Sequence, residues 1–227
     1  MYSNSELNSH KRISPHRSSR GGQPVSKITI HHTAGNIGLE ALGSWLSRPE
    51  TRASYNYGIS SDGRIGLFVE ERDASWASSN RANDAAAVTI GVANSGGAPD
   101  WPVSDAAYAS LLALIRCVCV RNGIGRLIYD GTSHSSNLTR HDMFSRQVCP
   151  GPFLRSRFPV IAAEVNRQLE TNTPALDVTI LANGKPIGVK GYIQGGRTWA
   201  PIAPVLDAAG VRWRWSSSQK SINLIVP

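Results

Sequence analysis

The sequence predicts an α/β domain followed by a small α+β domain, and two observations lead to this prediction. Segments typical of β-strands alternate with segments typical of helices up to about residue 170, and short strands separated by glycine-containing turns follow the polar segment 171–176. The chain of 227 residues has room for two domains, at roughly 100–200 residues per domain. We therefore expect a first domain at 25–170, a linker at 171–176 and a second domain at 177–227.

Four segments of the first domain have the composition of strands, namely residues 27–31, 55–60, 65–70 and 87–93. The first alternates β-branched residues and ends at paired histidines. Asp62-Gly63 lies between the second and the third, which predicts a hairpin. The fourth, AVTIGVA, is apolar on both faces, which is typical of a central strand in a sheet.

Three helices are expected, at residues 39–47, 104–121 and 159–169. Ser104 can cap the start of the second helix, and Gly123 follows its end. Pro159 suits the first position of the third helix, where its missing N–H costs nothing. Asn83 and Asp84 are expected in a loop before the fourth strand.

The chain is basic, with 24 Lys and Arg against 16 Asp and Glu, a net charge of +8. This charge favours a polyanionic partner such as nucleic acid, an anionic membrane or an anionic cell wall. The basic residues are densest at Arg12, Arg17 and Arg20 and form no stripe that alternates with aromatic residues, so nucleic acid is the weaker alternative. No apolar run approaches the ~18 residues of a membrane span.

Residues 1–24 are polar and basic, and they lack the apolar segment that a secretory signal peptide needs. We expect them to form a flexible basic lead-in. A protein of this kind that works outside the cell has to leave the cytoplasm by another route.

Two histidines and a cysteine are candidates for a metal site. Zinc hydrolases use three protein ligands and leave one position open for water. His31 ends a strand, and His141 and Cys149 lie eight residues apart in a loop closed by Pro and Gly, so the three can converge. The alternative is a solvated loop histidine and a buried cysteine. The other cysteines, Cys117 and Cys119, are expected in the core of a helix and not in a disulfide.

Four motifs together resemble the zinc-dependent N-acetylmuramoyl-L-alanine amidases. They are ITIHHTAGN, SYNYGISSDGRI, TIGVANSGG and RHDMFSRQVCPGPF, and the resemblance covers about residues 25–170. The family has the type-2 amidase fold, shared by phage amidases and peptidoglycan recognition proteins, and this chain looks most like phage endolysins of Gram-positive hosts. The resemblance implies a mixed central sheet flanked by helices, which agrees with the elements expected above.

The resemblance also implies a site and an activity. His31, His141 and Cys149 match the family's zinc ligands, and Tyr55 matches its catalytic tyrosine. The implied reaction is hydrolysis, by a zinc-activated water, of the peptidoglycan amide that joins N-acetylmuramic acid to L-alanine. The protein would be made in the host cytoplasm and act at the cell wall after release. The alternative is a module of the same fold that binds peptidoglycan without cutting it.

The chain departs from the family pattern at two places. Active members often carry Lys or Thr two positions before the third ligand, where this chain has Gln147, whose amide can donate a hydrogen bond but carries no charge. Some relatives place a glutamate in the central strand, where residues 91–93 here hold no carboxylate. Glu70 and Glu71 could substitute, with a solvated surface position as the alternative for each.

Three further residues are candidates for contacts with the substrate. Asn56 and Trp76 could line the groove, although Trp76 could equally belong to the core. Asn94 could contact sugar or peptide, with capping of a strand end as the alternative. His32 should face the opposite side of its strand from His31 and have a packing role, and His134 is expected to be a loop histidine.

The second domain shows a fainter resemblance, to the small stalk-type domain at the N-terminus of copper amine oxidases. Asn183-Gly184 predicts a hairpin and residues 204–209 a short helix, within a module of four strands and one helix. Residues 171–227 contain no His or Cys, so copper chemistry is not implied. We expect binding to the cell wall, including its anionic polymers, with a dimerisation module as the alternative. The tryptophans could stack on sugars or form a core, and they are Trp199, Trp213 and Trp215.

Overall fold

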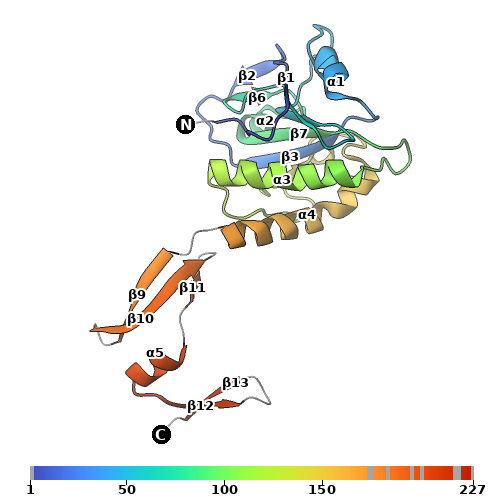
Figure 1. Cartoon of the computed structure of the whole chain (residues 1–227). Helices are drawn as coiled ribbons and strands as arrows, with labels where there is room; N and C mark the ends of the chain where they lie inside the picture. The colour runs from blue at the N-terminus through green and yellow to red at the C-terminus, as the bar shows by residue number, and fades with distance from the viewer. Residues whose placement is uncertain are drawn as a thin grey trace. The chain divides into compact units, whose positions relative to one another are not determined.

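The chain forms two compact units, Met1–Gln168 and Leu169–Pro227, in a computed structural model (Figure 1). The structure describes residues 3–172, 176–182, 185–194, 197–199, 202–216 and 221–225. Helix α4 (Gly151–Asn172) crosses the division and continues into the segment 171–176, so the first two residues of the expected linker are helical. Among the described residues, no helix has the length and apolarity that crossing a membrane requires.

A mixed sheet of six strands forms the centre of the first unit, as the sequence predicts. Its strand order is β1-β5-β4-β7-β3-β8, and only β4 and β5 pair antiparallel. The strands are β1 (His10–Lys11), β3 (Lys27–His32), β4 (Tyr57–Ile59), β5 (Ile65–Leu67), β7 (Ala87–Val92) and β8 (Leu138–Arg140). The central position expected for residues 87–93 is confirmed, because β7 lies between β4 and β3 and all its residues are buried.

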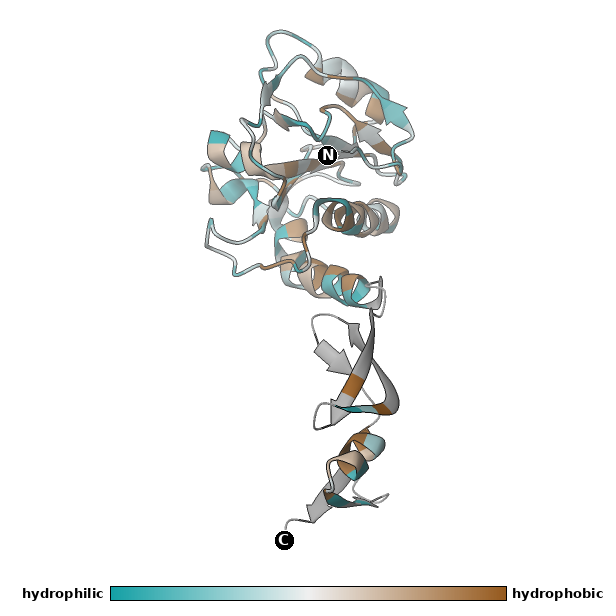
Figure 2. Ribbon diagram, turned by 90° about the vertical axis from the view of Figure 1, so that its left-hand side faces the viewer, coloured by the Kyte–Doolittle hydropathy of each residue, from teal (hydrophilic) through white to brown (hydrophobic). Residues whose placement is uncertain are grey.

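Helices flank this sheet on both sides. In Figure 1, α3 (Asp105–Asn122) and α4 lie on one side and α1 (Leu39–Leu46) on the other. The expected cap of α3 is confirmed, because the Ser104 side chain accepts a hydrogen bond from the Ala107 N–H and Gly123 ends the helix with φ of 68°. Figure 2 shows hydrophobic residues in the central strands and on both long helices. The core is built on these elements.

Two helical predictions need correction. Asn83 and Asp84 lie in a short helix, α2 (Arg81–Ala86), and not in a loop. Helix α4 begins at Gly151, so Pro159 lies inside the helix and not at its first position. A proline inside a helix removes one hydrogen bond. Side chains buried at helical spacing on both sides of it hold the helix together across the proline, namely Leu154, Phe158, Ile161 and Val165.

The expected flexible lead-in is also wrong for residues 3–20, because they pack against the rest of the first unit. Strand β1 joins the edge of the main sheet, and β2 (Arg17–Ser19) pairs antiparallel with β6 (Asp73–Ser75). The Arg20 guanidinium is buried, with 3% of the residue exposed, and donates to the carbonyl oxygens of Glu71, Asp84 and Ala85. Long-range pairing orders a segment whose local composition suggests a loop.

Glu71 lies in the interior and not on the solvated surface. The Tyr57 hydroxyl donates to its Oε1 at 2.7 Å, Asn122 donates to its Oε2 at 3.0 Å, and Arg121 forms an ion pair with it. Its backbone N–H donates to Asn4 Oδ1 at 2.9 Å, which ties the N-terminal segment to the same cluster. The ion pair between the buried Glu71 carboxylate and Arg121 therefore has a structural role.

The second unit has five described strands and one helix, one strand more than expected. A three-stranded antiparallel sheet is ordered β11-β10-β9, and β12 pairs antiparallel with β13. The elements are β9 (Leu176–Ala182), β10 (Lys185–Gln194), β11 (Arg197–Trp199), α5 (Ile202–Ala208), β12 (Arg212–Ser216) and β13 (Ser221–Ile225). Asn183-Gly184 and the side chains of the three tryptophans of this unit lie outside the described residues.

Glu71 and its neighbour Glu70 offer a matched pair for a stability test. Glu71→Ala should lower the free energy of unfolding by about 3–5 kcal/mol, because the partly buried Arg121 loses its only carboxylate partner among the described residues and the Tyr57 hydroxyl loses the acceptor of its proton. Glu70 pairs with the exposed side chains of Lys11 and Arg72, so Glu70→Ala should cost only about 0–1 kcal/mol. Urea unfolding measures both. Equal losses would contradict the burial of the Glu71 ion pair.

Candidate metal centre and its cleft

The register of two neighbouring parallel strands places two histidines side by side. Strand β3 pairs with β8, with Ile28 opposite Leu138 and Ile30 opposite Arg140. His31 follows Ile30 in β3, and His141 follows Arg140 directly after the end of β8. Neighbouring strands lie about 4.8 Å apart, and the two ring centroids are 4.7 Å apart. Both histidines therefore lie at the same edge of the sheet.

A tight loop returns Cys149 to this edge. His141 begins a 3₁₀ turn (His141–Met143), and the Asp142 N–H donates to the Cys149 carbonyl at 2.9 Å, which closes the loop. The Asp142 carboxylate pairs with Arg140 at 2.7 Å and with Arg155 of α4 at 3.2 Å. These contacts anchor both ends of the loop.

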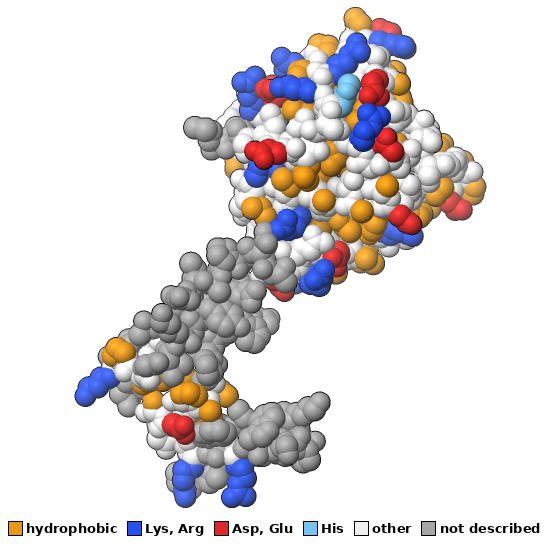
Figure 3. All heavy atoms as spheres, in the orientation of Figure 1, with side chains coloured by type: hydrophobic (Ala, Val, Ile, Leu, Met, Phe, Trp, Pro, Cys, Tyr) orange, Lys and Arg blue, Asp and Glu red, His pale blue; other side chains and the backbone are white. Residues whose placement is uncertain are grey.

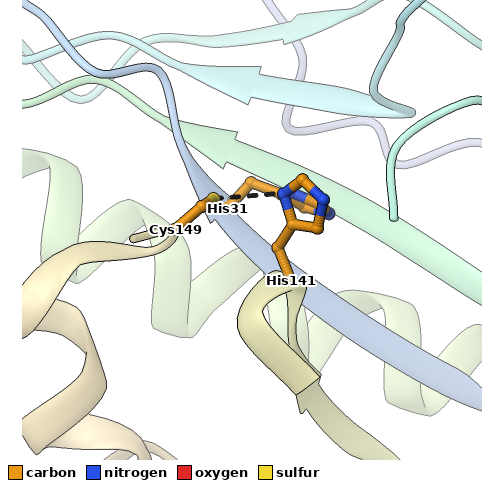
Figure 4. A group of neighbouring side chains, drawn as sticks. All are labelled: His31, His141 and Cys149. Atoms are coloured by element: carbon orange, nitrogen blue, oxygen red, sulfur yellow. Dashed lines mark hydrogen bonds between the residues drawn. The ribbon is translucent and has the colours of Figure 1, made fainter. Parts of the chain in front are cut away.

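The three side chains converge on one point (Figure 4). One donor atom from each lies within 4.8 Å of the others, and Cys149 Sγ is 3.7 Å from His31 Nδ1. Sulfur and nitrogen ligands at about 2.3 and 2.0–2.1 Å from a tetrahedral zinc stand roughly 3.5 Å apart. All three residues are buried, and the Nε2 atoms of His31 and His141 have no hydrogen-bond partner among the described residues. The donor set fits a tetrahedral metal ion.

Burial sets the protonation of these groups. It holds the pKa of His31 well below its usual range, and the neighbouring His141 and His32 lower it further. It also lowers the pKa of His141. Burial raises the pKa of the Cys149 thiol to about 12, opposed by the His32 N–H, which donates to Sγ at 3.4 Å. Neutral imidazoles keep a lone pair for a metal, and a bound cation reverses the effect of burial on the thiol.

The cluster opens into a cleft of about 720 Å³. His141 and Cys149 line it together with three residues that the sequence singled out, Tyr55, Gln147 and Trp76. Gln147 is exposed on the loop before Cys149, and Trp76 is 42% exposed, so Trp76 lines the groove and does not belong to the core. Glu70 and Glu71 do not line this cleft, so neither supplies a carboxylate to it.

Tyr55 packs against His31, with ring centroids 5.2 Å apart. Its ring lies directly over Gly91 of β7, where an added Cβ would stand 2.7 Å from Tyr55 Cδ2. Gly91 is one of the three central-strand positions without a carboxylate, and only glycine there leaves room for this ring. Burial raises the pKa of the Tyr55 hydroxyl, with the neighbouring Cys149 adding to the effect, so the phenol stays a hydrogen-bond donor.

Asn56 and Asn94 are fully buried outside the cleft, and their expected contacts with substrate are not possible in this arrangement. The Asn56 amide donates to the carbonyls of Val69 and Asp73, and its oxygen accepts from the Thr89 N–H at 3.0 Å. It joins neighbouring strands of the sheet. The Asn94 amide donates to the Trp101 carbonyl at 2.8 Å just after β7, which matches the strand-end alternative.

His32 packs against a neighbouring ring as expected, and His134 lies in a turn of the loop, as expected. His32 lies edge-on to Trp101 with centroids 5.2 Å apart, although its exposed edge also reaches the cleft. The His134 ring nitrogen lies 2.6 Å from the Met143 carbonyl. Cleft residues that the sequence analysis missed include Ser18, Trp45, Arg52 and Arg81. They come from four separate segments, and no local pattern in the sequence connects them to the cluster.

A mixed sheet whose edge carries two histidines and a cysteine beside an open cleft is typical of hydrolases that use a metal ion. The family model described as N-acetylmuramoyl-L-alanine amidase matches residues 21–152. This chain therefore belongs to the N-acetylmuramoyl-L-alanine amidase family. No curated protein matches the chain at a significant level.

Several solved structures share the fold of the first unit. A selenomethionine derivative of AmpD is 19% identical over 70% of this chain and 96% of that chain, with a TM-score of 0.54. The endolysin N-acetylmuramoyl-L-alanine amidase LysCS from Clostridium intestinale URNW is 20% identical over 71% and 99%, with a TM-score of 0.52. The catalytic domain of XlyA is 18% identical over 69% and 97%, with a TM-score of 0.51. At these identities the likeness concerns the fold.

The contact between Tyr55 and Gly91 gives a test of the site's packing. Gly91→Ala should force the Tyr55 ring away from His31 and lower the free energy of unfolding by about 1–3 kcal/mol, the usual cost of overpacking. Gly97→Ala is the control, because a Cβ at Gly97 meets nothing within 4 Å. Urea unfolding of both variants measures the difference, and a Gly91→Ala protein as stable as Gly97→Ala would refute the close approach.

Proposed function

We propose that this chain is a zinc-dependent N-acetylmuramoyl-L-alanine amidase that cuts the amide between N-acetylmuramic acid and L-alanine in peptidoglycan. The observation that carries the proposal is the convergence of His31, His141 and Cys149 on one point at the end of an open cleft, in a chain of this family. Imidazole nitrogen and thiolate sulfur are both zinc ligands, and three protein ligands leave one position open, as in catalytic zinc sites.

The chain's own residues have distinct tasks in this proposal. His31, His141 and Cys149 would hold the ion, which when bound supplies a Lewis acid for the amide carbonyl and lowers the pKa of water toward ~7. Tyr55, neutral and on the cleft wall beside His31, donates a hydrogen bond to the carbonyl oxygen as negative charge develops. Gln147 lies on the same cleft and offers its amide as a second donor without charge.

A second candidate function is a peptidoglycan-binding module that does not cut. Two observations favour it: Gln147 brings no positive charge to the cleft, and Gly91 leaves the central strand without a carboxylate. Digestion of purified peptidoglycan separates the two functions. New free amino groups of L-alanine without new reducing sugar ends would establish the amidase. Binding without new amino groups would establish the module, and new reducing ends alone would mean that the bond is wrong.

The proposal extends to the biological role. An endolysin of a phage or prophage that lyses Gram-positive cell walls fits the similarity in fold to the endolysin LysCS and the net charge of +8. Figure 3 shows basic and acidic side chains interspersed on one face of the first unit.

The second unit would bind the cell wall. The intact protein should then pellet with purified walls more than a chain that ends at Asn172, and equal pelleting would count against that role.

The zinc assignment makes a prediction about the three cysteines. Cys149→Ser should lose most of the zinc, because a neutral hydroxyl replaces a thiolate poorly. Cys117→Ser and Cys119→Ser should keep about one zinc per chain, since both lie on α3 away from the cluster. Elemental analysis of the purified proteins measures the content. Full zinc occupancy in Cys149→Ser would remove Cys149 from the ligand set.

Tyr55 and Gln147 separate metal binding from catalysis. Tyr55→Phe should keep zinc and stability yet lose activity on the order of 10²–10³-fold, the usual cost of one oxyanion donor. Gln147→Lys should hold or raise the activity if charge at this position stabilises the oxyanion. Rates of release of L-alanine amino groups measure both. Unchanged turnover in Tyr55→Phe would exclude it from the mechanism, and a sharp fall in Gln147→Lys would show that the amide itself is needed.

A further inference from the structure

The N-terminal segment reaches the cleft although it precedes the family region. The family match begins at residue 21, whereas Ser18 and Ser19 of β2 line the cleft. Strand β2 pairs with β6, with Ser18 opposite Ala74 and Arg17 opposite Ser75, which places it beside Trp76. One wall of the cleft is therefore built from residues outside the matched region.

The same segment fixes the orientation of Trp76. The indole Nε1–H donates to Ser18 Oγ at 2.8 Å, and the ring packs on His16 with centroids 5.4 Å apart. An exposed tryptophan that is 42% accessible normally samples several rotamers, and these two contacts select one. The rest of the ring stays open to the cleft.

Hydrogen bonds tie this segment to the loop before β4. The His16 ring nitrogen lies 2.7 Å from the Arg48 carbonyl, and Ser54 Oγ donates to the His16 carbonyl at 2.5 Å. The backbone N–H of Trp76 donates in turn to Ser54 Oγ at 2.9 Å. Hydrogen bonds thus connect the N-terminal segment, the loop before β4 and the segment that contains Trp76, although the three are distant in the sequence.

A second hollow, of about 530 Å³, lies next to the cleft. It is lined by two prolines, an imidazole, a guanidinium and an indole, namely Pro15, His16, Pro49, Arg52 and Trp76. Arg52 and Trp76 line both hollows, so the second continues the first. Arg52 adopts φ of 45°, a conformation that is uncommon for a residue with a side chain and is often retained at ligand sites.

We propose that residues 14–19 form part of the substrate site, with Ser18 and His16 as positioning residues for Trp76. The second hollow then takes a further sugar of the glycan strand beyond the residue that carries the cleaved amide. Its flat indole ring and its two apolar proline rings suit the apolar face of a sugar, and Arg52 can donate to hydroxyl groups at the rim. The inference rests on the proposed amidase function, because it assumes that peptidoglycan occupies the cleft.

The test uses two soluble muramoyl peptides with the same stem peptide, one with a single sugar and one with several. Ser18→Ala removes the acceptor for the Trp76 indole, so KM for the longer fragment should rise about 3- to 10-fold with kcat unchanged, the usual worth of one neutral hydrogen bond. KM for the single-sugar fragment should not change. Ser18→Thr keeps a hydroxyl and should restore the wild-type KM.

Two controls keep the test specific. Ser5→Ala changes a buried serine elsewhere in the N-terminal segment, next to Cys117 and away from the cleft, and should leave both KM values unchanged. Trp76→Phe lacks the indole N–H, so adding Ser18→Ala to it should cause no further rise in KM. Additive effects of the two changes would mean that Ser18 does not act through Trp76.

An equal rise in KM for both fragments would reduce the segment to a packing role, and an unchanged KM for both would remove the second hollow from the substrate site. Binding of the two fragments to the metal-free protein gives the same comparison without turnover. The amidase function would be refuted, and the subsite supported, if the wild-type protein cut neither fragment but bound the longer one more tightly, and if Ser18→Ala removed this preference.

Discussion

The parallel register between β3 and β8 is the constraint on which the site depends. It sets His31 and His141 one strand spacing apart at the same edge of a rigid sheet, so the two imidazoles need no loop to bring them together. The third donor, Cys149, then requires only a short loop that begins and ends at that edge. A slip of one residue would turn a histidine to the other face and separate the donors.

The next constraint is space beside the cluster. The Tyr55 ring fits against His31 because β7 has a glycine at position 91, and the same glycine excludes a carboxylate there. The phenol of Tyr55 and the amide of Gln147 are among the groups that line the cleft, whereas the acidic pair Glu70 and Glu71 is engaged elsewhere. Packing and chemistry are coupled here, since a larger residue in the central strand would displace the tyrosine that the proposed reaction uses.

The sequence predicted those parts of the structure that depend on local patterns. The buried strand at 87–93 follows from periodicity and the capped helix after Ser104 from capping chemistry. The spacing of the histidines and Cys149 left two alternatives open, and the resemblance to the family singled out the three residues that converge in the structure. The sequence-based prediction was wrong where residues are buried by partners distant in the chain. The N-terminal segment pairs with strands about 55 residues away, and Arg20 in that segment donates to the carbonyl of Glu71. For Asn56, a polar side chain in a strand looked like a surface contact, and only the assembled sheet shows that it bonds neighbouring strands.

X-ray absorption at the zinc edge of the purified protein tests the central claim most directly. The account predicts one sulfur at about 2.3 Å and two imidazole nitrogens at about 2.0–2.1 Å, with a light atom in the fourth position. The sulfur should disappear in Cys149→Ser and persist in Cys119→Ser. A zinc shell of nitrogen and oxygen alone in the wild-type protein would contradict the convergence of His31, His141 and Cys149 on one ion.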